Sequence, residues 1–213
     1  MMRIEERVVK ILEQLNKDYR DAGPRLKFSS EFECLVAVVL SAQSTDDQVN
    51  QVTAELFRDY NTPEVLVNVD LQQLEEKIKG VGLFRNKAKS IKKLSKEIIE
   101  KHNGVVPEDF DELLALPGVG RKTANVVRSV AFNKPGLGVD THVQRVTNRM
   151  GLVCEKNPEK TELGLKAIIP EEQWSRAHHL FLFHGRRVCR ARKADCKHCT
   201  VEYWCSKVFE DEG

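Results

Sequence analysis

Apolar residues recur at helical spacing along most of this chain, and no other feature restricts its possible folds as strongly. Residues 35–39 lie in a nearly all-apolar run that is typical of a buried helix. No segment alternates convincingly between apolar and polar residues, as a half-buried strand would. One amphipathic stripe holds Ile4, Val8, Leu12, Leu15 and Tyr19. Further helices are expected at 71–78, 86–102, 110–115, 121–133, 141–150, 159–169 and 173–184, so the sequence predicts an all-α protein.

Turn and capping residues divide this helical pattern. Thr45 can cap a helix that follows it, because its hydroxyl accepts a hydrogen bond from an unpaired backbone N–H. Gly104 stands just past the expected end of the helix at 86–102, where glycine tolerates a left-handed backbone. In "NKPGLG" (133–138), Pro and Gly interrupt the helical pattern. We expect a domain boundary there.

Composition excludes several classes of protein. The 213 residues are 41% hydrophobic and 31% charged, which is ordinary for a soluble protein and unlike a disordered one. No apolar run approaches the ~18 residues that a membrane helix needs. The N-terminal "MMRIEERVVKILEQL" contains acids and does not resemble a secretory signal. We therefore expect a cytoplasmic protein that does not contact membranes.

Four of the six cysteines gather at the C-terminal end, in "CRARKADCKHCTVEYWC". Six, two and five residues separate Cys189, Cys196, Cys199 and Cys205. Four thiolates within so short a segment predict one tetrahedral sulfur site, for zinc or an iron–sulfur cluster, and spacing alone does not choose between them. Disulfides are disfavoured because no secretory signal indicates an oxidising compartment.

Positive charge is concentrated in two blocks, although the net charge is only +2. Residues 85–96 hold six Lys or Arg and no acid, and residues 176–198 hold seven with a single Asp. Either block can line a phosphate-binding face or form a solvated helix surface, and these two interpretations are about equally favoured. Within the second block, Arg190, Arg192 and Lys193 lie between the first two clustered cysteines, so a metal-pinned loop would hold them toward phosphates.

The segment "LPGVGRKTANVV" (116–127) predicts a tight turn between two helices, followed by two cations at a helix N-terminus. Backbone N–H groups converge at such a turn and attract an anion, for which DNA phosphate is the expected candidate. Arg121 is then a phosphate partner. A plain helix–helix turn is the other interpretation. A similar Gly-Val-Gly stands at 80–82, also between two expected helices and followed by basic residues.

Lys122 and Asp140 are the candidate catalytic residues. The helix N-terminus and the neighbouring Arg121 disfavour a charged ammonium on Lys122, which favours the neutral amine that attacks carbon. Asp140 precedes an amphipathic helix in "GVDTHVQRVTNRM" (138–150). It is a good N-cap, and capping does not exclude a catalytic role.

With these motifs together, the chain resembles the endonuclease III family, bifunctional DNA glycosylases of the helix-hairpin-helix superfamily. The motifs are "LPGVGRKTANVV", the "VDTH" at 139–142, the "LSAQSTD" at 40–46 and the cysteine spacing, in the family's order between Phe32 and Cys205. The resemblance implies a six-helix domain at 24–134, a second helical domain of 1–23 with 135–213, and DNA between them. It also implies a [4Fe–4S] cluster on Cys189, Cys196, Cys199 and Cys205.

The resemblance further implies base-excision repair, in which oxidised pyrimidines are flipped out of duplex DNA and removed and abasic sites are cut. Lys122 would displace the base and form a Schiff base, Asp140 would assist, and β-elimination would break the strand. Gln43 and Leu83 match positions that fill the gap left by the flipped nucleotide. Ser41, Asp46 and His142 match pocket positions. Other residues expected at the DNA are Gly118, Val119, Gly120, Arg121, Arg190, Arg192 and Lys193. We expect a nucleoid-associated monomer.

Two alternatives stay open from the residues alone. Adenine-mismatch glycosylases share the turn, the aspartate and the cluster, but they lack the turn lysine and carry a catalytic glutamate where this chain has Val38. A helix-hairpin-helix module that only binds DNA is the other alternative. The joint presence of Lys122 and Asp140 argues against it.

Overall fold

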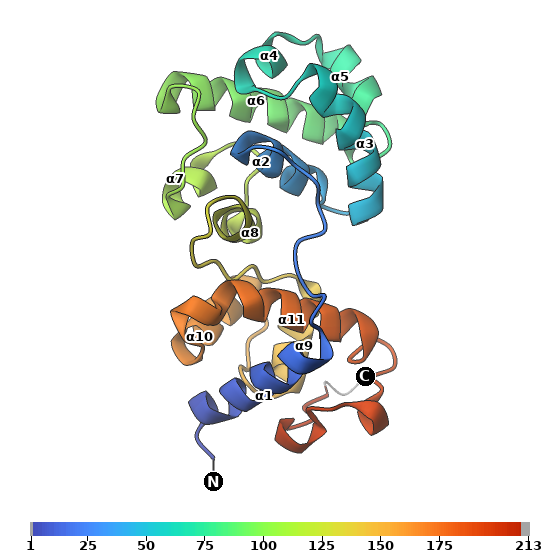
Figure 1. The fold of residues 1–213 in the computed structure, drawn as a ribbon, viewed down its shortest axis with the longest axis vertical. Coiled ribbons are helices and arrows are strands. Elements are labelled where there is room, and N and C mark those ends of the chain that lie inside the picture. Colours follow the sequence, from blue (N-terminus) through green and yellow to red (C-terminus); the bar gives the residue numbers. More distant parts are fainter. Residues whose placement is uncertain (1, 210–213) are drawn as a thin grey trace. The chain divides into compact units, whose positions relative to one another are not determined.

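The computed structural model describes residues 2–209, and it confirms the all-α prediction (Figure 1). Within these residues the only β-type pairing is an isolated bridge between Cys189 and Ala194. No helix of the described part is long and apolar enough to span a bilayer. The α-helices are α1 (Ile4–Asp18), α2 (Glu31–Leu40), α3 (Asp46–Asp59), α4 (Pro63–Asn68), α5 (Leu71–Ile78), α6 (Phe84–His102), α7 (Phe110–Ala115), α8 (Arg121–Ala131), α9 (Thr141–Arg149), α10 (Pro158–Ile168) and α11 (Trp174–Arg187).

Helix starts follow local capping chemistry. Thr45 caps α3 as expected, and it forms a reciprocal capping box with Gln48. Helix α4 was not predicted from the sequence, although Thr62 caps it and Pro63 occupies its first turn. This helix is only six residues long, so its apolar residues do not reveal a helical period. Its signal was the Thr-Pro pair, not the pattern.

The chain divides into two compact units. One unit consists of Arg25–Gly136. The other combines the N-terminal part of the chain, up to Pro24, with the C-terminal part, from Leu137 onward. The division falls inside the expected boundary at 133–138. The unit of Arg25–Gly136 holds the seven helices α2 to α8, one more than the resemblance implies. Its centre is α2, whose residues 32–40 are all buried and which contacts α3, α6 and α8. A helix that is apolar on nearly all sides belongs in such a core, as its sequence indicates.

The other unit joins the two ends of the chain. Val8, Ile11 and Leu15 of α1 are fully buried in one apolar cluster with residues of α9 and α11, such as Val146 and Phe181. Three short 3₁₀ helices complete this unit, at Glu171–Gln173, Cys196–His198 and Glu202–Trp204, and the last two belong to the cysteine segment. The amphipathic stripe of the N-terminal helix is therefore a core contact.

Candidate functional site

The turn between α7 and α8 requires glycine at one of its two glycine positions. Gly118 has φ +81°, and a Cβ added there would lie 2.7 Å from the Cβ of Ser90 on α6. Gly120 is the N-cap of α8 with φ −98°, and an added Cβ would meet nothing within 4 Å. The Val119 N–H donates to the Leu116 carbonyl at 3.1 Å, which closes the turn. The hairpin thus packs directly on α6.

The two cations that open α8 have different surroundings. The Arg121 guanidinium lies over the Phe110 ring of α7, 4.9 Å from its centroid, and its side chain is half-buried. Lys122 is exposed. The Asn125 side chain donates to the Arg121 carbonyl at 3.0 Å and is itself buried. Lys122 is therefore an exposed side chain in the first turn of α8, next to a residue whose carbonyl the buried Asn125 contacts.

Asp140 is the N-cap of α9. Its Oδ1 accepts hydrogen bonds from the backbone N–H groups of His142 and Val143, both at 2.9 Å. Two residues earlier, the Gly138 carbonyl lies 2.5 Å from Nδ1 of His178, a buried side chain of α11. The capping role is thus present in the structure. Both cap hydrogen bonds use one carboxylate oxygen, and they leave Oδ2 outside the cap.

The expected pocket residues lie at the ends of three helices. Ser41 is the C-cap of α2, and its hydroxyl donates to the Val38 carbonyl at 2.7 Å. Asp46 is the first residue of α3. His142 lies in the first turn of α9 with Nδ1 3.2 Å from the Arg145 guanidinium, and burial lowers the pKa of its imidazole. Ser41 and Asp46 belong to the unit of Arg25–Gly136, and His142 belongs to the other.

Gln43 and Leu83 lie on adjacent segments and share an unusual backbone. Both are exposed, Leu83 by 56%, and both have positive φ, 54° and 56°. The Gly82 N–H donates to the Ser44 hydroxyl at 2.9 Å, and a Cβ added at Gly82 would lie 2.7 Å from the Gln43 carbonyl oxygen. A bulky side chain at positive φ is strained, and such residues concentrate at functional sites.

The two Gly-Val-Gly segments use glycine for different reasons. At 80–82, a Cβ added at Gly80 would meet the Val52 side chain at 2.9 Å, and one added at Gly82 would meet the Gln43 carbonyl oxygen at 2.7 Å. Gly80 therefore leaves room for a side chain, and Gly82 permits close approach of another backbone. At 118–120, the first glycine adopts a positive φ. The resemblance between the segments therefore reflects two separate packing needs.

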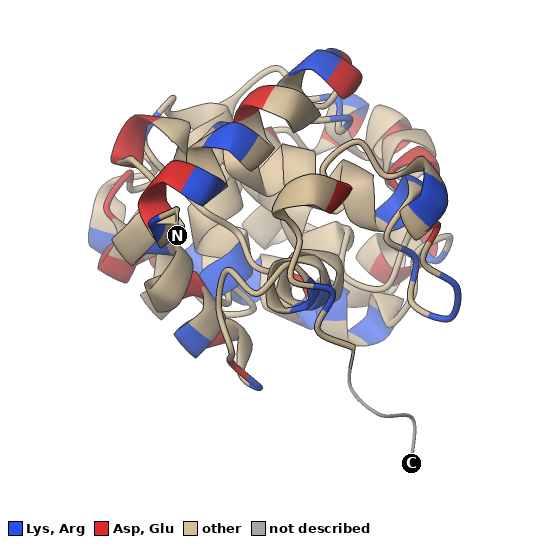
Figure 2. Ribbon diagram, turned by 90° about the horizontal axis from the view of Figure 1, so that it is seen from below, with Lys and Arg blue, Asp and Glu red and all other residues tan. Residues whose placement is uncertain are grey.

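The basic block at 85–96 is partly directed inward. Lys87 is buried, and its ammonium donates to the carbonyl oxygens of Leu40 and Ala42. Lys92 donates to the Val69 carbonyl. These two cations hold loops and do not belong to a phosphate-binding face. Lys89, Lys93 and Lys96 are exposed, and acidic and basic residues are intermixed along most helices (Figure 2).

The four C-terminal cysteines are free, half-buried thiols on one segment. Burial, and secondarily the charges of Cys205, Cys189 and Cys196, raises the pKa of Cys199 to about 11. The Cys199 sulfur lies 3.6 Å from Nε2 of the buried His184. Among the described residues, no three Cys, His, Asp or Glu side chains lie close enough together to hold a single metal ion.

A short loop projects the cations between the first two cysteines. The bridge between Cys189 and Ala194 closes it, and Arg190, Arg192 and Lys193 are exposed. Arg149 of α9 fixes its backbone by donating to the carbonyls of Arg190 and Ala191, both at 2.8 Å. Arg149 therefore fixes the backbone of the loop, while the cationic side chains of the loop are exposed to solvent.

Sequence reasoning missed the residues that support the site. Lys87, Ser44 and Arg149 make hydrogen bonds to backbone or loop atoms far away in the chain. The only available signal for Lys87 was its place beside apolar Ala88 and Ile91 on a basic helix, where a lysine at a core-facing position needs a partner.

Comparison with known proteins gives a consistent result. Residues 36–171 match the model of the HhH-GPD superfamily of base excision DNA repair proteins. Endonuclease III of Bacillus subtilis (strain 168) is 48% identical over 195 residues, covering 91% of this chain and 89% of that protein. Endonuclease III of Escherichia coli (strain K12) is 44% identical over 197 residues, covering 92% and 93%.

Solved structures agree with these relatives. A trapped covalent endonuclease III–DNA intermediate, an estranged-adenine complex, is 46% identical with a TM-score of 0.91 and 97% coverage of both chains. A non-covalent endonuclease III–DNA complex is 45% identical with a TM-score of 0.90 and the same coverage. A thermostable thymine-DNA glycosylase is 28% identical with a TM-score of 0.80 and 94% coverage of both chains.

Proposed function

Because this chain belongs to the endonuclease III family of the HhH-GPD superfamily, and so is a DNA glycosylase with AP-lyase activity, we propose that it removes oxidised pyrimidines from duplex DNA. The substrate nucleotide leaves the stack, since the sugar carbon cannot be attacked inside an intact helix. The same protein then cuts the strand at the abasic site.

Lys122 is the proposed nucleophile. Its neutral amine attacks C1′ of the flipped nucleotide, the bond from C1′ to the base breaks, and the base leaves with the bonding electron pair and takes up a proton. The nitrogen then loses one of its two protons, the C1′–O4′ bond breaks, and O4′ keeps the bonding pair and takes up a proton. The nitrogen lone pair forms the new C=N bond, which gives a protonated imine that keeps the remaining N–H. That imine acidifies the C2′ hydrogen, whose loss expels the 3′-phosphate. The supporting observation is an exposed lysine in the first turn of α8, directly after the hairpin turn.

Asp140 is the proposed proton acceptor for the attacking amine. Its carboxylate also offsets positive charge that develops on the sugar as the base departs. The cap hydrogen bonds to Oδ1 fix the carboxylate while the other oxygen stays outside the cap. Ser41, Asp46 and His142 are proposed to contact the flipped base.

The DNA backbone is proposed to bind at two places. The hairpin turn Gly118–Gly120 and the start of α8 present backbone N–H groups to a phosphate, with Arg121 beside them. The exposed Arg190, Arg192 and Lys193 supply a second, sequence-independent contact. Gln43 and Leu83 are proposed to enter the duplex where the flipped nucleotide has left. A chromosomal substrate would place a monomeric enzyme at the nucleoid.

A [4Fe–4S] cluster is the proposed cofactor, and the residues present fit it. Four thiols on one half-buried segment supply the ligand set such clusters take, and the Lys207 N–H lies 3.4 Å from the Cys205 sulfur. When bound, the cluster ties the segment together and supplies no proton or nucleophile. The two compact units are proposed to be the two domains of the enzyme.

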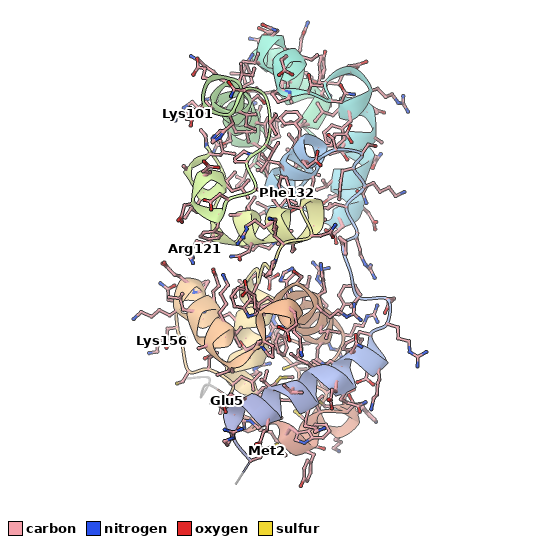
Figure 3. All side chains as sticks on the ribbon, turned by 60° about the vertical axis from the view of Figure 1, so that its left-hand side comes forward. Met2, Glu5, Lys101, Arg121, Phe132 and Lys156 are labelled. Atoms are coloured by element: carbon pink, nitrogen blue, oxygen red, sulfur yellow. The ribbon has the colours of Figure 1, made fainter. Side chains whose placement is uncertain are left out.

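Borohydride trapping tests the nucleophile. With a duplex that contains one abasic site, the wild type should give a slowly migrating covalent adduct, and Lys122→Gln should give none. Lys156→Gln, which changes an exposed lysine of the other unit (Figure 3), is the matched control and should trap normally. An equally strong adduct from Lys122→Gln would assign the nucleophile to another residue.

A further inference from the structure

Lys87 is buried, and among residues 2–209 no acidic side chain pairs with it, yet its ammonium is fully hydrogen-bonded. Its side chain is 6% exposed. The ammonium lies 2.8 Å from the Leu40 carbonyl oxygen, 2.5 Å from that of Ala42 and 3.2 Å from the Ser44 hydroxyl. An ammonium has three N–H donors, so each donor has one acceptor. Burial lowers the pKa of Lys87, and these oxygens offset the cost of keeping the cation there.

These acceptors tie together segments that are distant in the chain. Leu40 is the last residue of α2, where a cation also interacts favourably with the helix dipole. Ala42 and Ser44 flank Gln43 in the loop before α3. Lys87 itself stands in the first turn of α6, four residues after Leu83, and its backbone N–H donates to the Leu83 carbonyl at 3.1 Å. One side chain thus bonds to both neighbours of Gln43 from the helix that Leu83 begins.

Ser44 links the same two segments a second time. Its hydroxyl oxygen accepts from Lys87 and also from the Gly82 N–H at 2.9 Å. Gly82 immediately precedes Leu83, and the absence of a side chain at Gly82 lets the Gln43 carbonyl approach. Lys87, Ser44 and Gly82 therefore form a clamp around the backbone of Gln43 and Leu83, and we use the name clamp for these three residues.

The clamp explains how two strained backbones persist at exposed positions. Gln43 and Leu83 have φ of 54° and 56°, which costs free energy unless the surroundings enforce it. Neither exposed side chain is held by the core. The ordering instead comes from hydrogen bonds of the Ala42 carbonyl and the Ser44 hydroxyl, which flank Gln43, and of the Gly82 N–H and the Leu83 carbonyl. Side chains fixed before binding lose less entropy when they act.

We propose that Lys87 is a positioning residue that, with Ser44, presets Gln43 and Leu83 for insertion into the duplex. This inference rests on the insertion role proposed above for those two side chains. Because the Lys87 ammonium is buried with all three donors in use, we do not expect it to contact the damaged base or its sugar. Its loss should therefore impair steps that require an opened base pair and spare chemistry on a nucleotide that has no partner strand.

Two substrates separate positioning from chemistry. The first is a duplex with one oxidised pyrimidine, and the second is a single strand with one abasic site. In single-turnover reactions, Lys87→Met should slow excision from the duplex by about tenfold or more, because a charge-assisted hydrogen-bond set is lost. Cleavage of the single strand should stay within about twofold of wild type. Equal slowing on both substrates, or none on the duplex, would overturn the proposal.

Matched variants keep the test decisive if Lys87→Met folds poorly. Ser44→Ala removes both hydroxyl hydrogen bonds of the clamp and should slow only the duplex reaction, by a few-fold, while Ser44→Thr keeps the hydroxyl and should restore the rate. Lys92→Met removes the other ammonium–carbonyl contact of α6, to Val69, and should affect neither rate. If Ser44→Ala excises the base from the duplex at the wild-type rate, the proposed role of the clamp is wrong.

A double-mutant cycle distinguishes failure of the clamp from failure of the insertion role. If Gln43→Ala alone leaves the duplex rate unchanged, the insertion role is wrong. If Gln43→Ala slows the duplex reaction but Ser44→Ala does not, the clamp alone is wrong. Where both hold, Ser44→Ala should have a smaller effect in the Gln43→Ala background and almost none once Leu83→Ala is added as well, because the clamp acts through both residues. Amide hydrogen exchange at Gly82 should also accelerate in Ser44→Ala.

Discussion

At the scale of single residues, Asp140 combines a structural and a proposed chemical role on one carboxylate. Its Oδ1 accepts both hydrogen bonds of the α9 cap. Aspartate and asparagine cap helices about equally well, whereas alanine does not. Charge and cap can therefore be removed separately. A proton acceptor needs the charge, and a cap needs only the oxygen.

Asp140→Asn should keep the stability of the protein and lose most of its turnover. The amide oxygen can still accept from the N–H groups of His142 and Val143, so the melting temperature should hardly change. Single-turnover excision should fall by about tenfold or more, because general base assistance contributes 10²–10⁴-fold in typical enzymes. Asp140→Ala should show the same loss of rate and also unfold more easily, by about 0.5–2 kcal/mol. An unchanged rate in Asp140→Asn would leave Asp140 as a cap alone.

Leu83 should show the opposite relation between stability and activity. Its left-handed backbone is unfavourable for leucine and acceptable for glycine, and the side chain is 56% exposed. Leu83→Gly should thus match or exceed wild type in thermal stability while it slows excision from duplex DNA. Leu83→Ala keeps the backbone strain and should slow excision without the gain. Normal excision by Leu83→Gly would show that the strain serves no insertion role.

At the scale of elements, the hairpin between α7 and α8 was the most predictable part of the site. Its glycines, its proline and the following cations are neighbours in the chain, so local chemistry determines the turn. What local chemistry does not reveal is which glycine is essential. That depends on Ser90 of α6, which lies against Gly118 only in the folded protein.

Gly118→Ala should weaken DNA binding and stability together, whereas Gly120→Ala should have little effect on either. The first places a Cβ at positive φ and 2.7 Å from the Ser90 Cβ, and the second meets nothing within 4 Å. Positive φ alone costs alanine about 1–2 kcal/mol. Thermal unfolding and affinity for undamaged duplex measure the two effects. Similar losses from both variants would show that the turn needs flexibility and not a particular backbone.

The cysteine loop is an element whose cations have no core contact of their own. Each neutralised phosphate contributes about −0.9 to the slope of log affinity against log salt concentration. Arg192→Ala or Lys193→Ala should weaken binding to damaged and undamaged duplex alike, and make that slope shallower by up to about one. Titrations at several salt concentrations measure it. Weakening confined to damaged DNA would assign the loop to lesion recognition.

At the scale of the whole molecule, the sequence predicted what depends on near neighbours. Helix positions, the Thr45 cap and the grouped cysteines all follow from local pattern. The burial of Lys87 against Leu40 does not, since the two are 47 positions apart. The hydrogen bond from Arg149 to the Arg190 carbonyl also joins residues that are far apart in the chain, so local pattern does not predict it. A basic helix predicts charge, but only the tertiary fold decides which of its cations face inward.

The cysteine segment should govern the stability of only one of the two compact units. This segment and the residues directly after it bond to α1, α9 and the residue after α9. Thr200 donates to Asp18, the Val208 N–H to the Arg149 carbonyl at 2.8 Å, the Ser206 N–H to the Met150 carbonyl at 3.2 Å, and Arg7 to the Ser206 hydroxyl at 2.7 Å. All of these partners belong to the unit that joins the chain ends. A bound cluster stabilises whatever its ligands hold in place.

Loss of the cluster should therefore unfold that unit first and leave the other largely intact. Wild type should be yellow-brown with roughly four iron atoms per chain, and Cys199→Ser should lose iron and colour. In Cys199→Ser, amide hydrogen exchange should accelerate in α1, α9 and α11, because their shared core loses its ties to the cysteine segment. Protection in α2 and α6 should persist, since cooperative units open separately.

Cys34→Ser, which changes a buried cysteine of the other unit, should keep the iron and alter exchange in α2 instead. Uniform loss of protection in Cys199→Ser would mean that the two units unfold as one, and colourless wild type with bound zinc would overturn the cluster itself.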